Sequence, residues 1–179
     1  MAATELDVLF SQQQIQKRVC ELGAQLAHDF RGQPVVLLGV LKGACIFLSD
    51  LARTIPLECS FDFLAVSSYG NRVQSTGEVR LLKDADCAME DGNIVLVEDI
   101  LDTGLTLAYL KELIQARRPR ALKIAALLDK PSRRVKPISA DYVGFTIGDE
   151  FVVGYGMDHA ERFRNLPDIC VLRDAEGAK

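Results

Sequence analysis

Several features that would point to other classes of protein are missing from this 179-residue sequence. Tryptophan is absent and there are only two histidines, His28 and His159, so no histidine cluster is available for a metal site. No apolar run reaches the roughly 18 residues that cross a bilayer. The first ten residues lack the basic start and apolar stretch of a secretory signal. We therefore expect a cytoplasmic protein without a membrane segment.

Other common motifs and charge patterns are missing as well. The five cysteines are spread singly and never form CxxC, which favours buried free thiols over disulfides or a zinc site. The sequence has no G-x-x-x-x-G-K-[ST] loop, and Gly154-Tyr155-Gly156 lacks the third glycine of a dinucleotide-binding fingerprint. With 21 basic and 25 acidic residues, the net charge of -4 argues against non-specific nucleic-acid binding.

Hydrophobic periodicity predicts an α/β fold. A length of 179 residues favours a single domain. Ser11 and Gln14 match a capping box, and apolar residues then recur at helical spacing until Gly32. Two further helices are expected, at 43–53 and 106–117. The expected strands are 34–40, 59–67, 77–82, 93–97, 121–128, 141–147, 151–154 and 169–172. The strand, helix, strand order over 93–128 indicates a parallel unit.

The segment VEDILDTGLT, residues 97–106, is the most informative part of the chain. An apolar strand ends in Glu98 and Asp99, and a glycine-containing turn then leads from Asp102 into a helix. Free N–H groups and the positive end of the dipole at a helix N-terminus suit a phosphate, while ribose hydroxyls and hydrated magnesium suit the carboxylates. The alternative is an ordinary helix cap with solvated carboxylates.

The longer segment VLVEDILDTGLTL resembles the phosphoribosyl pyrophosphate signature of type I phosphoribosyltransferases, and closely that of their hypoxanthine-guanine branch. The resemblance covers about residues 10–172. It implies a mainly parallel twisted sheet flanked by helices, with a small hood built from the chain ends, mainly 131–179. It also implies a homodimer or homotetramer that uses Mg2+ to join hypoxanthine or guanine to phosphoribosyl pyrophosphate, giving IMP or GMP and pyrophosphate for purine salvage.

The same resemblance assigns roles to the residues of the signature. Glu98 and Asp99 would hold the ribose hydroxyls and, with Asp158, the metal ion. Asp102 would act as acid and base near purine N7. The ribose phosphate would lie in the cradle formed by Asp102, Thr103, Gly104, Leu105 and Thr106, in which Leu105 replaces the lysine of some family members.

Further roles fall outside the signature, and each has an ordinary structural alternative. Lys42 and Gly43, in a loop that often contains a cis peptide bond, would bind pyrophosphate together with Arg164; the alternatives are a turn with a solvated lysine and a surface ion pair between Arg164 and Asp158. Ser68 and Tyr69 would belong to a mobile loop over the reaction centre, or to a plain surface loop. The purine would contact Lys130, Phe151, Val152 and Asp158, of which the lysine could instead be solvated and the two apolar residues part of the core.

Two rival functions remain at this stage. One is an RNA-binding regulator of the same fold, but such regulators lack an aspartate at position 102 and the VVGYGxD segment, and both are present here. The other is transfer to a different base. Lys130 favours an oxygen acceptor and so disfavours adenine, whereas the choice among hypoxanthine, guanine and xanthine stays open.

Overall fold

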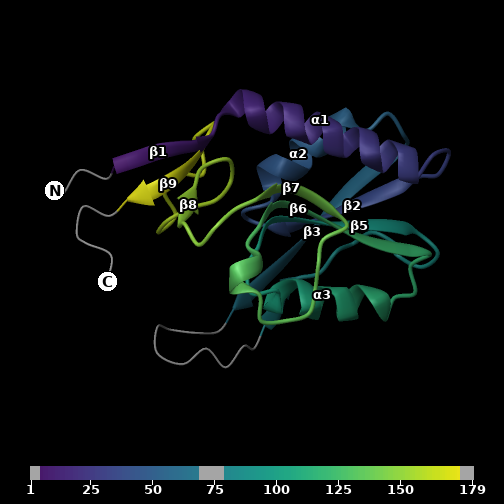
Figure 1. Ribbon diagram of the computed structural model, residues 1–179. Helices are drawn as coiled ribbons and strands as arrows, with labels where there is room; N and C mark the ends of the chain where they lie inside the picture. Colours follow the sequence, from purple (N-terminus) through teal and green to yellow (C-terminus); the bar gives the residue numbers. More distant parts are fainter. Residues whose placement is uncertain (1–4, 69–78, 174–179) are drawn as a thin grey trace.

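The computed structural model describes residues 5–68 and 79–173, which form two sheets of different size (Figure 1). The larger sheet has six strands in the order β4-β3-β2-β5-β6-β7. All neighbouring pairs are parallel except β3 and β4, which confirms the predicted mainly parallel α/β fold. Its strands are β2 (Val35–Leu41), β3 (Cys59–Ser68), β4 (Val79–Lys83), β5 (Asn93–Leu101), β6 (Ala121–Asp129) and β7 (Tyr142–Thr146).

Helices cover both faces of this sheet, which explains why its central strands are apolar almost throughout. Figure 1 shows α1 (Gln12–Asp29) and α2 (Cys45–Thr54) on one face and α3 (Leu105–Gln115) on the other. A short 3-10 helix, η1 (Pro131–Arg133), follows β6. Alternate residues of β5 divide accordingly: Val95 and Val97 join the α1 and α2 core, whereas Ile94 and Leu96 join the α3 core. None of the described helices is long and apolar enough to cross a membrane.

The predicted start of α1 is confirmed in detail. The Ser11 side chain accepts the N–H of Gln14, and the Gln14 side chain accepts the N–H of Ser11. The expectation of buried cysteines is only partly right. All five thiols are free, but Cys170 alone is buried, and Cys20 is exposed on α1. Cys20 follows the buried Val19 on an amphipathic helix, where neighbouring positions face different sides.

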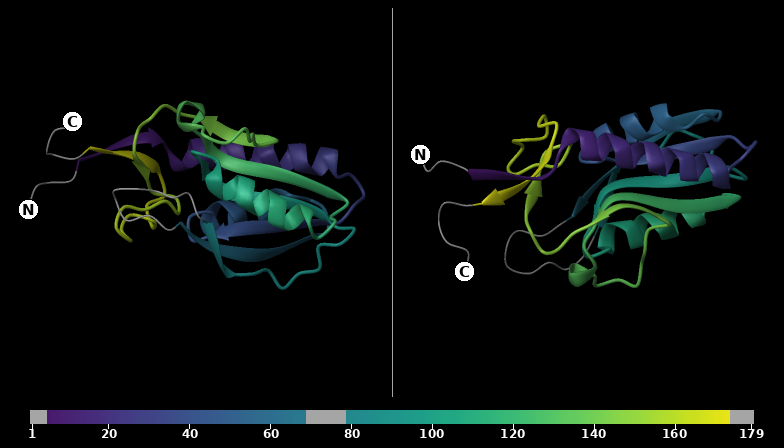
Figure 2. Two further views of the ribbon diagram at one scale, coloured as in Figure 1. Left: turned by 90° about the horizontal axis from the view of Figure 1, so that it is seen from below. Right: turned by 45° about the horizontal axis from the view of Figure 1, so that its top comes forward.

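The smaller sheet brings the two ends of the described chain together (Figure 2). Its antiparallel strands are β1 (Glu5–Phe10), β9 (Ile169–Arg173) and β8 (Val152–Val153), in that order. The sequence pattern does not reveal β1, because its register with β9, Glu5 opposite Arg173, depends on residues far apart in the chain. After residue 131, the strand β7 joins the edge of the larger sheet, and β8 and β9 belong to the smaller one.

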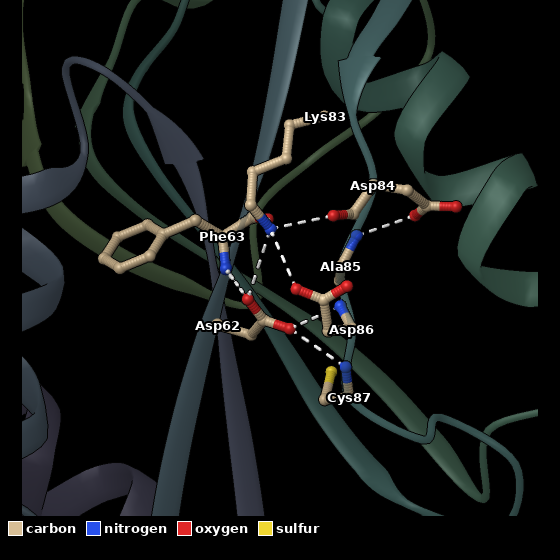
Figure 3. Close-up of polar contacts among 7 residues, drawn as sticks. All are labelled: Asp62, Phe63, Lys83, Asp84, Ala85, Asp86 and Cys87. Carbon is tan, nitrogen blue, oxygen red and sulfur yellow. Dashed lines mark hydrogen bonds and ion pairs between the residues drawn. The ribbon is translucent and has the colours of Figure 1, made fainter.

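Asp62 on β3 fixes the segment that follows β4 (Figure 3). Its Oδ2 accepts the N–H groups of Asp86 at 2.7 Å and Cys87 at 2.9 Å, and its Oδ1 accepts that of Phe63 at 2.7 Å. The Lys83 ammonium lies 3.6 Å from Oδ1. Burial acts to raise the pKa of Asp62, but the three N–H donors and Lys83 together lower it.

Candidate functional site

The carboxyl ends of three neighbouring parallel strands, β2, β5 and β6, meet at one edge of the larger sheet. They bring Lys42, Asp99 and Lys130 to that edge, where α/β proteins generally bind ligands. The strand β5 is longer than predicted: it continues past Val97 to Leu101, because Glu98, Ile100 and Leu101 still pair with β6. Glu98 and Asp99 are therefore held rigidly within a strand.

Glu98 and Asp99 form a pair of adjacent carboxylic acids, of which Glu98 is buried and Asp99 is half-buried. The Glu98 side chain is 7% exposed, and its Oε2 has no hydrogen-bond partner among the described residues. Burial raises the pKa of Glu98 well above its ordinary value, and the charge of Asp99 adds to this effect. Burial likewise raises the pKa of Asp99, although hydrogen bonds from Glu98 and the Ile100 N–H oppose it. Such a pair suits a cation or a hydroxyl donor.

Gly43 leaves the space that Asp99 fills. A Cβ atom at position 43 would lie 1.6 Å from Asp99 Oδ2, far inside contact distance. In the same loop, the peptide bond between Leu41 and Lys42 is cis, as the family resemblance implies. A glycine is thus required where the β2 loop meets the β5 carboxylate.

The residues present fit magnesium as partial ligands. Among residues 5–68 and 79–173, no three carboxylate, histidine or cysteine side chains gather as a ready metal site. Magnesium is usually held by one or two carboxylates together with phosphate and water oxygens, so Glu98 and Asp99 with their unpaired oxygen suffice. The third predicted ligand, Asp158, is engaged otherwise: its Oδ1 pairs with Arg164 at 2.6 Å, and its Oδ2 accepts the Glu161 N–H at 2.8 Å.

The turn between β5 and α3 is tight and contains a left-handed glycine. Gly104 has φ 80°, in the region that glycine favours. Leu105 and Thr106 open α3, and the Leu105 N–H donates to Thr103 Oγ1 at 3.4 Å. The Thr103 carbonyl accepts the N–H groups of residues 135 and 136 at 2.9 and 3.0 Å, so a neighbouring segment supports the turn.

Asp102 stands at the beginning of this turn and faces an arginine that the sequence analysis missed. Its Oδ1 is buried and has no hydrogen bond to the part of the chain that the structure describes, and Arg133 Nε lies 3.3 Å away as an ion-pair partner. Arg133 also donates to Asp149 Oδ1 at 3.2 Å. Asp149 and then Asp102 raise the pKa of Arg133. The available signal was the position of Arg133 just after Lys130, at the carboxyl end of β6.

Lys42 and Arg164, the two cations expected at pyrophosphate, are brought to the same carboxylate. Lys42 Nζ lies 2.9 Å from Glu161 Oε2, and Arg164 Nη2 lies 3.6 Å from Glu161 Oε1. The Lys42 contact lowers the pKa of Glu161. Arg164 also donates to the Gly156 carbonyl at 2.7 Å. Glu161 was not predicted from sequence, and its position shows that this place attracts an anion.

The residues expected at the base lie next to β6 and the smaller sheet. Lys130 is buried, and its Nζ donates to the Glu150 carbonyl at 2.5 Å. Phe151 is 52% exposed, with His159 packed edge-on against it at 5.4 Å between ring centroids. Val152 is buried in β8. An exposed aromatic ring and a buried ammonium bound to the backbone of the preceding residue fit a flat, polar-edged ligand.

The predicted mobile loop lies largely beyond the part of the chain that the structure describes. Ser68 is the last residue of β3, and Tyr69 is outside the described residues. The proposed role of this loop stays a prediction.

The chain matches known phosphoribosyltransferases along most of its length. The family model of the phosphoribosyl transferase domain matches residues 5–160. Hypoxanthine-guanine phosphoribosyltransferase of Bacillus subtilis (strain 168) is 51% identical over 168 residues, which are 94% of this chain and 93% of that protein. The protein of the same name from Staphylococcus aureus (strain Mu50) is 48% identical over 167 residues, 93% of each chain.

Solved structures give the same result for the fold. A crystal structure of a hypoxanthine-guanine phosphoribosyltransferase from Bacillus anthracis, with a HEPES molecule in its active site, has a TM-score of 0.89 and 49% identity, covering 93% of this chain and 99% of that one. A hypoxanthine phosphoribosyltransferase from Staphylococcus aureus has a TM-score of 0.90 and 48% identity, covering 93% and 91%.

Proposed function

Because the chain belongs to the phosphoribosyl transferase family, we propose that it transfers the phosphoribosyl group of phosphoribosyl pyrophosphate to hypoxanthine, guanine or both. The products are IMP or GMP and pyrophosphate, and the role is purine salvage. One observation supports this assignment most strongly. The acidic pair and phosphate-type turn of β5 lie beside β6, whose carboxyl end carries the buried Lys130.

The proposed sugar site consists of the carboxyl end of β5 and the start of α3. Glu98 and Asp99 bind the ribose hydroxyls and, as partial ligands, Mg2+. The backbone of residues 102–106, with the Thr103 and Thr106 hydroxyls, binds the ribose phosphate at the positive end of α3. Bound magnesium would neutralise charge on the departing pyrophosphate. Asp158 is available as a further ligand once it leaves Arg164.

The cations at the β2 loop and the hood stabilise the leaving group in this proposal. Lys42 and Arg164 exchange Glu161 for pyrophosphate, and Gly43 lets the substrate approach the backbone closely. The smaller sheet with its loops corresponds to the family's hood. Ser68 and Tyr69 would exclude water while the anomeric carbon is cationic.

The base-side residues orient the purine and move its proton. Lys130 donates to the exocyclic oxygen, Phe151 stacks on the ring, and the Val152 backbone and Asp158 read the other edge. Asp102 accepts the N7 proton as N9 forms the glycosidic bond, and it returns that proton in the reverse reaction. Each of these groups lies at a strand end or on the hood, so the reactants are held in one orientation.

The remaining features of the proposal follow the family. We assign residues 1–179 to one catalytic domain, place the protein in the cytoplasm, and expect a homodimer or homotetramer that binds neither nucleic acid nor membranes. Relatives whose lengths are covered to 91–99% by this chain support the single-domain assignment.

An absorbance assay with phosphoribosyl pyrophosphate and magnesium tests the proposal. Hypoxanthine, guanine, xanthine, adenine and uracil are offered separately to the wild-type protein. We expect turnover of hypoxanthine or guanine and none of adenine, which has no oxygen for Lys130. Turnover of no base would contradict the proposal and favour the RNA-binding regulator, which filter binding of RNA would then test.

A further inference from the structure

Arg133 connects two acidic residues that approach the base site from different segments. Its Nε lies 3.3 Å from Asp102 Oδ1 in the turn after β5, and its Nη1 donates to Asp149 Oδ1 at 3.2 Å in the loop before Phe151. We propose that Arg133 is a positioning residue for the transferase reaction: it orients Asp102 and fixes the loop that carries Phe151. This inference rests on the proposed function.

The contact with Asp102 differs from an ordinary surface ion pair. Within residues 5–68 and 79–173, the buried Asp102 Oδ1 has no hydrogen bond, and Arg133 is the cation that compensates its charge. The Asp102 side chain is 37% exposed, and since Oδ1 is buried, this exposure belongs to its other atoms. Arg133 therefore holds one oxygen inward and leaves the rest of the carboxylate open to a base.

The backbone that carries Arg133 is itself tied to the base site. The Arg133 N–H donates to the Lys130 carbonyl at 3.2 Å, which closes the short helix η1. Lys130 in turn donates its N–H to the Leu101 carbonyl at 3.0 Å and its ammonium to the Glu150 carbonyl at 2.5 Å. One lysine thus anchors the strand end before Asp102 and the loop after Asp149.

The loop that precedes Phe151 is held at both of its ends. The Ile147 N–H donates to the Asp129 carbonyl at 2.9 Å, and the Leu172 N–H donates to the Phe151 carbonyl at 2.9 Å. Between these backbone bonds, Asp149 reaches Arg133 with its side chain. Loss of the guanidinium would leave Asp102 and Asp149 as two like charges with no cation between them, and both would turn away.

Four variants test the proposal by steady-state kinetics with each substrate varied in turn. They are Arg133→Gln, Arg133→Lys, Asp149→Asn and the double variant Arg133→Gln/Asp149→Asn. Arg118→Gln is the matched control, because Arg118 forms an exposed ion pair with Glu90 beyond the opposite end of α3. Thermal unfolding of every variant accompanies the kinetics.

We expect Arg133→Gln to lower kcat and to raise the KM for hypoxanthine about fivefold. A change of about fivefold corresponds to the upper end of the range of energies measured for exposed ion pairs. The KM for phosphoribosyl pyrophosphate should change less than about twofold, because Arg133 reaches the Asp102 side chain, whereas the ribose phosphate binds to the backbone of the turn and pyrophosphate to Lys42 and Arg164. Arg133→Lys should restore part of the loss. The double variant should lose less than the product of the single effects, since both substitutions break one connection.

An unchanged KM for hypoxanthine in Arg133→Gln would overturn the proposal. So would an equal rise in both KM values, or single effects that multiply in the double variant. If the wild-type protein and Arg118→Gln turn over neither hypoxanthine nor guanine, it is the proposed function that fails, because the comparison of variants then has no reaction to act on.

Discussion

Replacing Gly43 by alanine should damage the sugar site much more than the fold. The new Cβ would lie 1.6 Å from Asp99 Oδ2 and 2.5 Å from its Cγ. Ordinary contacts of this kind lie near 3.4 Å, so the carboxylate has to retreat by almost 2 Å or the loop that carries Lys42 has to move. Either movement separates groups that the proposed mechanism places on one substrate.

The size of the effect follows from this displacement. A misplacement of about 1 Å in a catalytic arrangement costs on the order of 100-fold in rate, so we expect Gly43→Ala to lower kcat/KM for phosphoribosyl pyrophosphate at least about 100-fold. Overpacking by one methyl group generally destabilises a protein by about 1–3 kcal/mol, which leaves a marginally stable domain folded. The assay is hypoxanthine turnover at varied phosphoribosyl pyrophosphate, with circular dichroism to confirm folding.

Gly92→Ala is the matched control for this experiment. A Cβ at position 92 would meet its nearest atoms, the Met89 carbonyl oxygen and Ile94 Cδ1, at 3.3 and 3.4 Å, and the residue lies before β5, at the end of that strand opposite the site. We expect nearly wild-type kinetics. A Gly43→Ala protein that keeps kcat/KM within about threefold of wild type would refute the reasoning that close packing of this loop on Asp99 forms the sugar site.

Three further predictions follow from single side chains. In metal-free protein, the melting temperature should fall as pH rises above 4.5, because folded Glu98 keeps a proton that the unfolded chain releases near its ordinary pKa of 4.5. Glu98→Gln should flatten the fall, and an unchanged slope would count against the raised pKa. Asp62→Asn should cost about 1–2 kcal/mol in urea unfolding at pH 7. Because the pKa of Asp62 is lowered from 3.8, the difference should disappear as pH falls below that value; a constant difference would contradict the charged hydrogen bonds. Lys130→Met should lower kcat/KM for hypoxanthine about 10- to 100-fold by removing a charged donor. The variant should stay folded but melt at a lower temperature, because the Glu150 carbonyl loses the Lys130 ammonium as its donor. An unaffected kcat/KM would remove Lys130 from the base site.

The sequence predicts the central α/β unit well because the signals there are local. Continuous apolar runs reveal β5 and β6, and the turn through Gly104 reveals the start of α3. The end of β5 was placed too early, at Val97. Acidic residues normally mark the end of a strand, and only the pairing with β6 shows that Glu98 lies inside it.

Contacts between distant parts of the chain could not be predicted in this way. The strand β1 exists because β9 offers a partner more than 150 residues later. Arg133 and Glu161 were missed for a similar reason: an arginine or glutamate in a polar segment is usually solvated, and only the fold shows that they face Asp102 and Lys42. The family resemblance supplied roles for residues whose local pattern alone favoured ordinary turns.

The central claim is that the site at the carboxyl ends of β2, β5 and β6 transfers the phosphoribosyl group, with Asp102 accepting the purine proton. The most direct test compares two properties of Asp102→Asn, its turnover and its binding of phosphoribosyl pyrophosphate. Asparagine keeps the size of the side chain but cannot take the proton. We predict that kcat with hypoxanthine falls about 100-fold or more, while calorimetry with magnesium finds phosphoribosyl pyrophosphate bound about as tightly as by the wild type. A variant that turns over hypoxanthine at the wild-type rate would contradict the account.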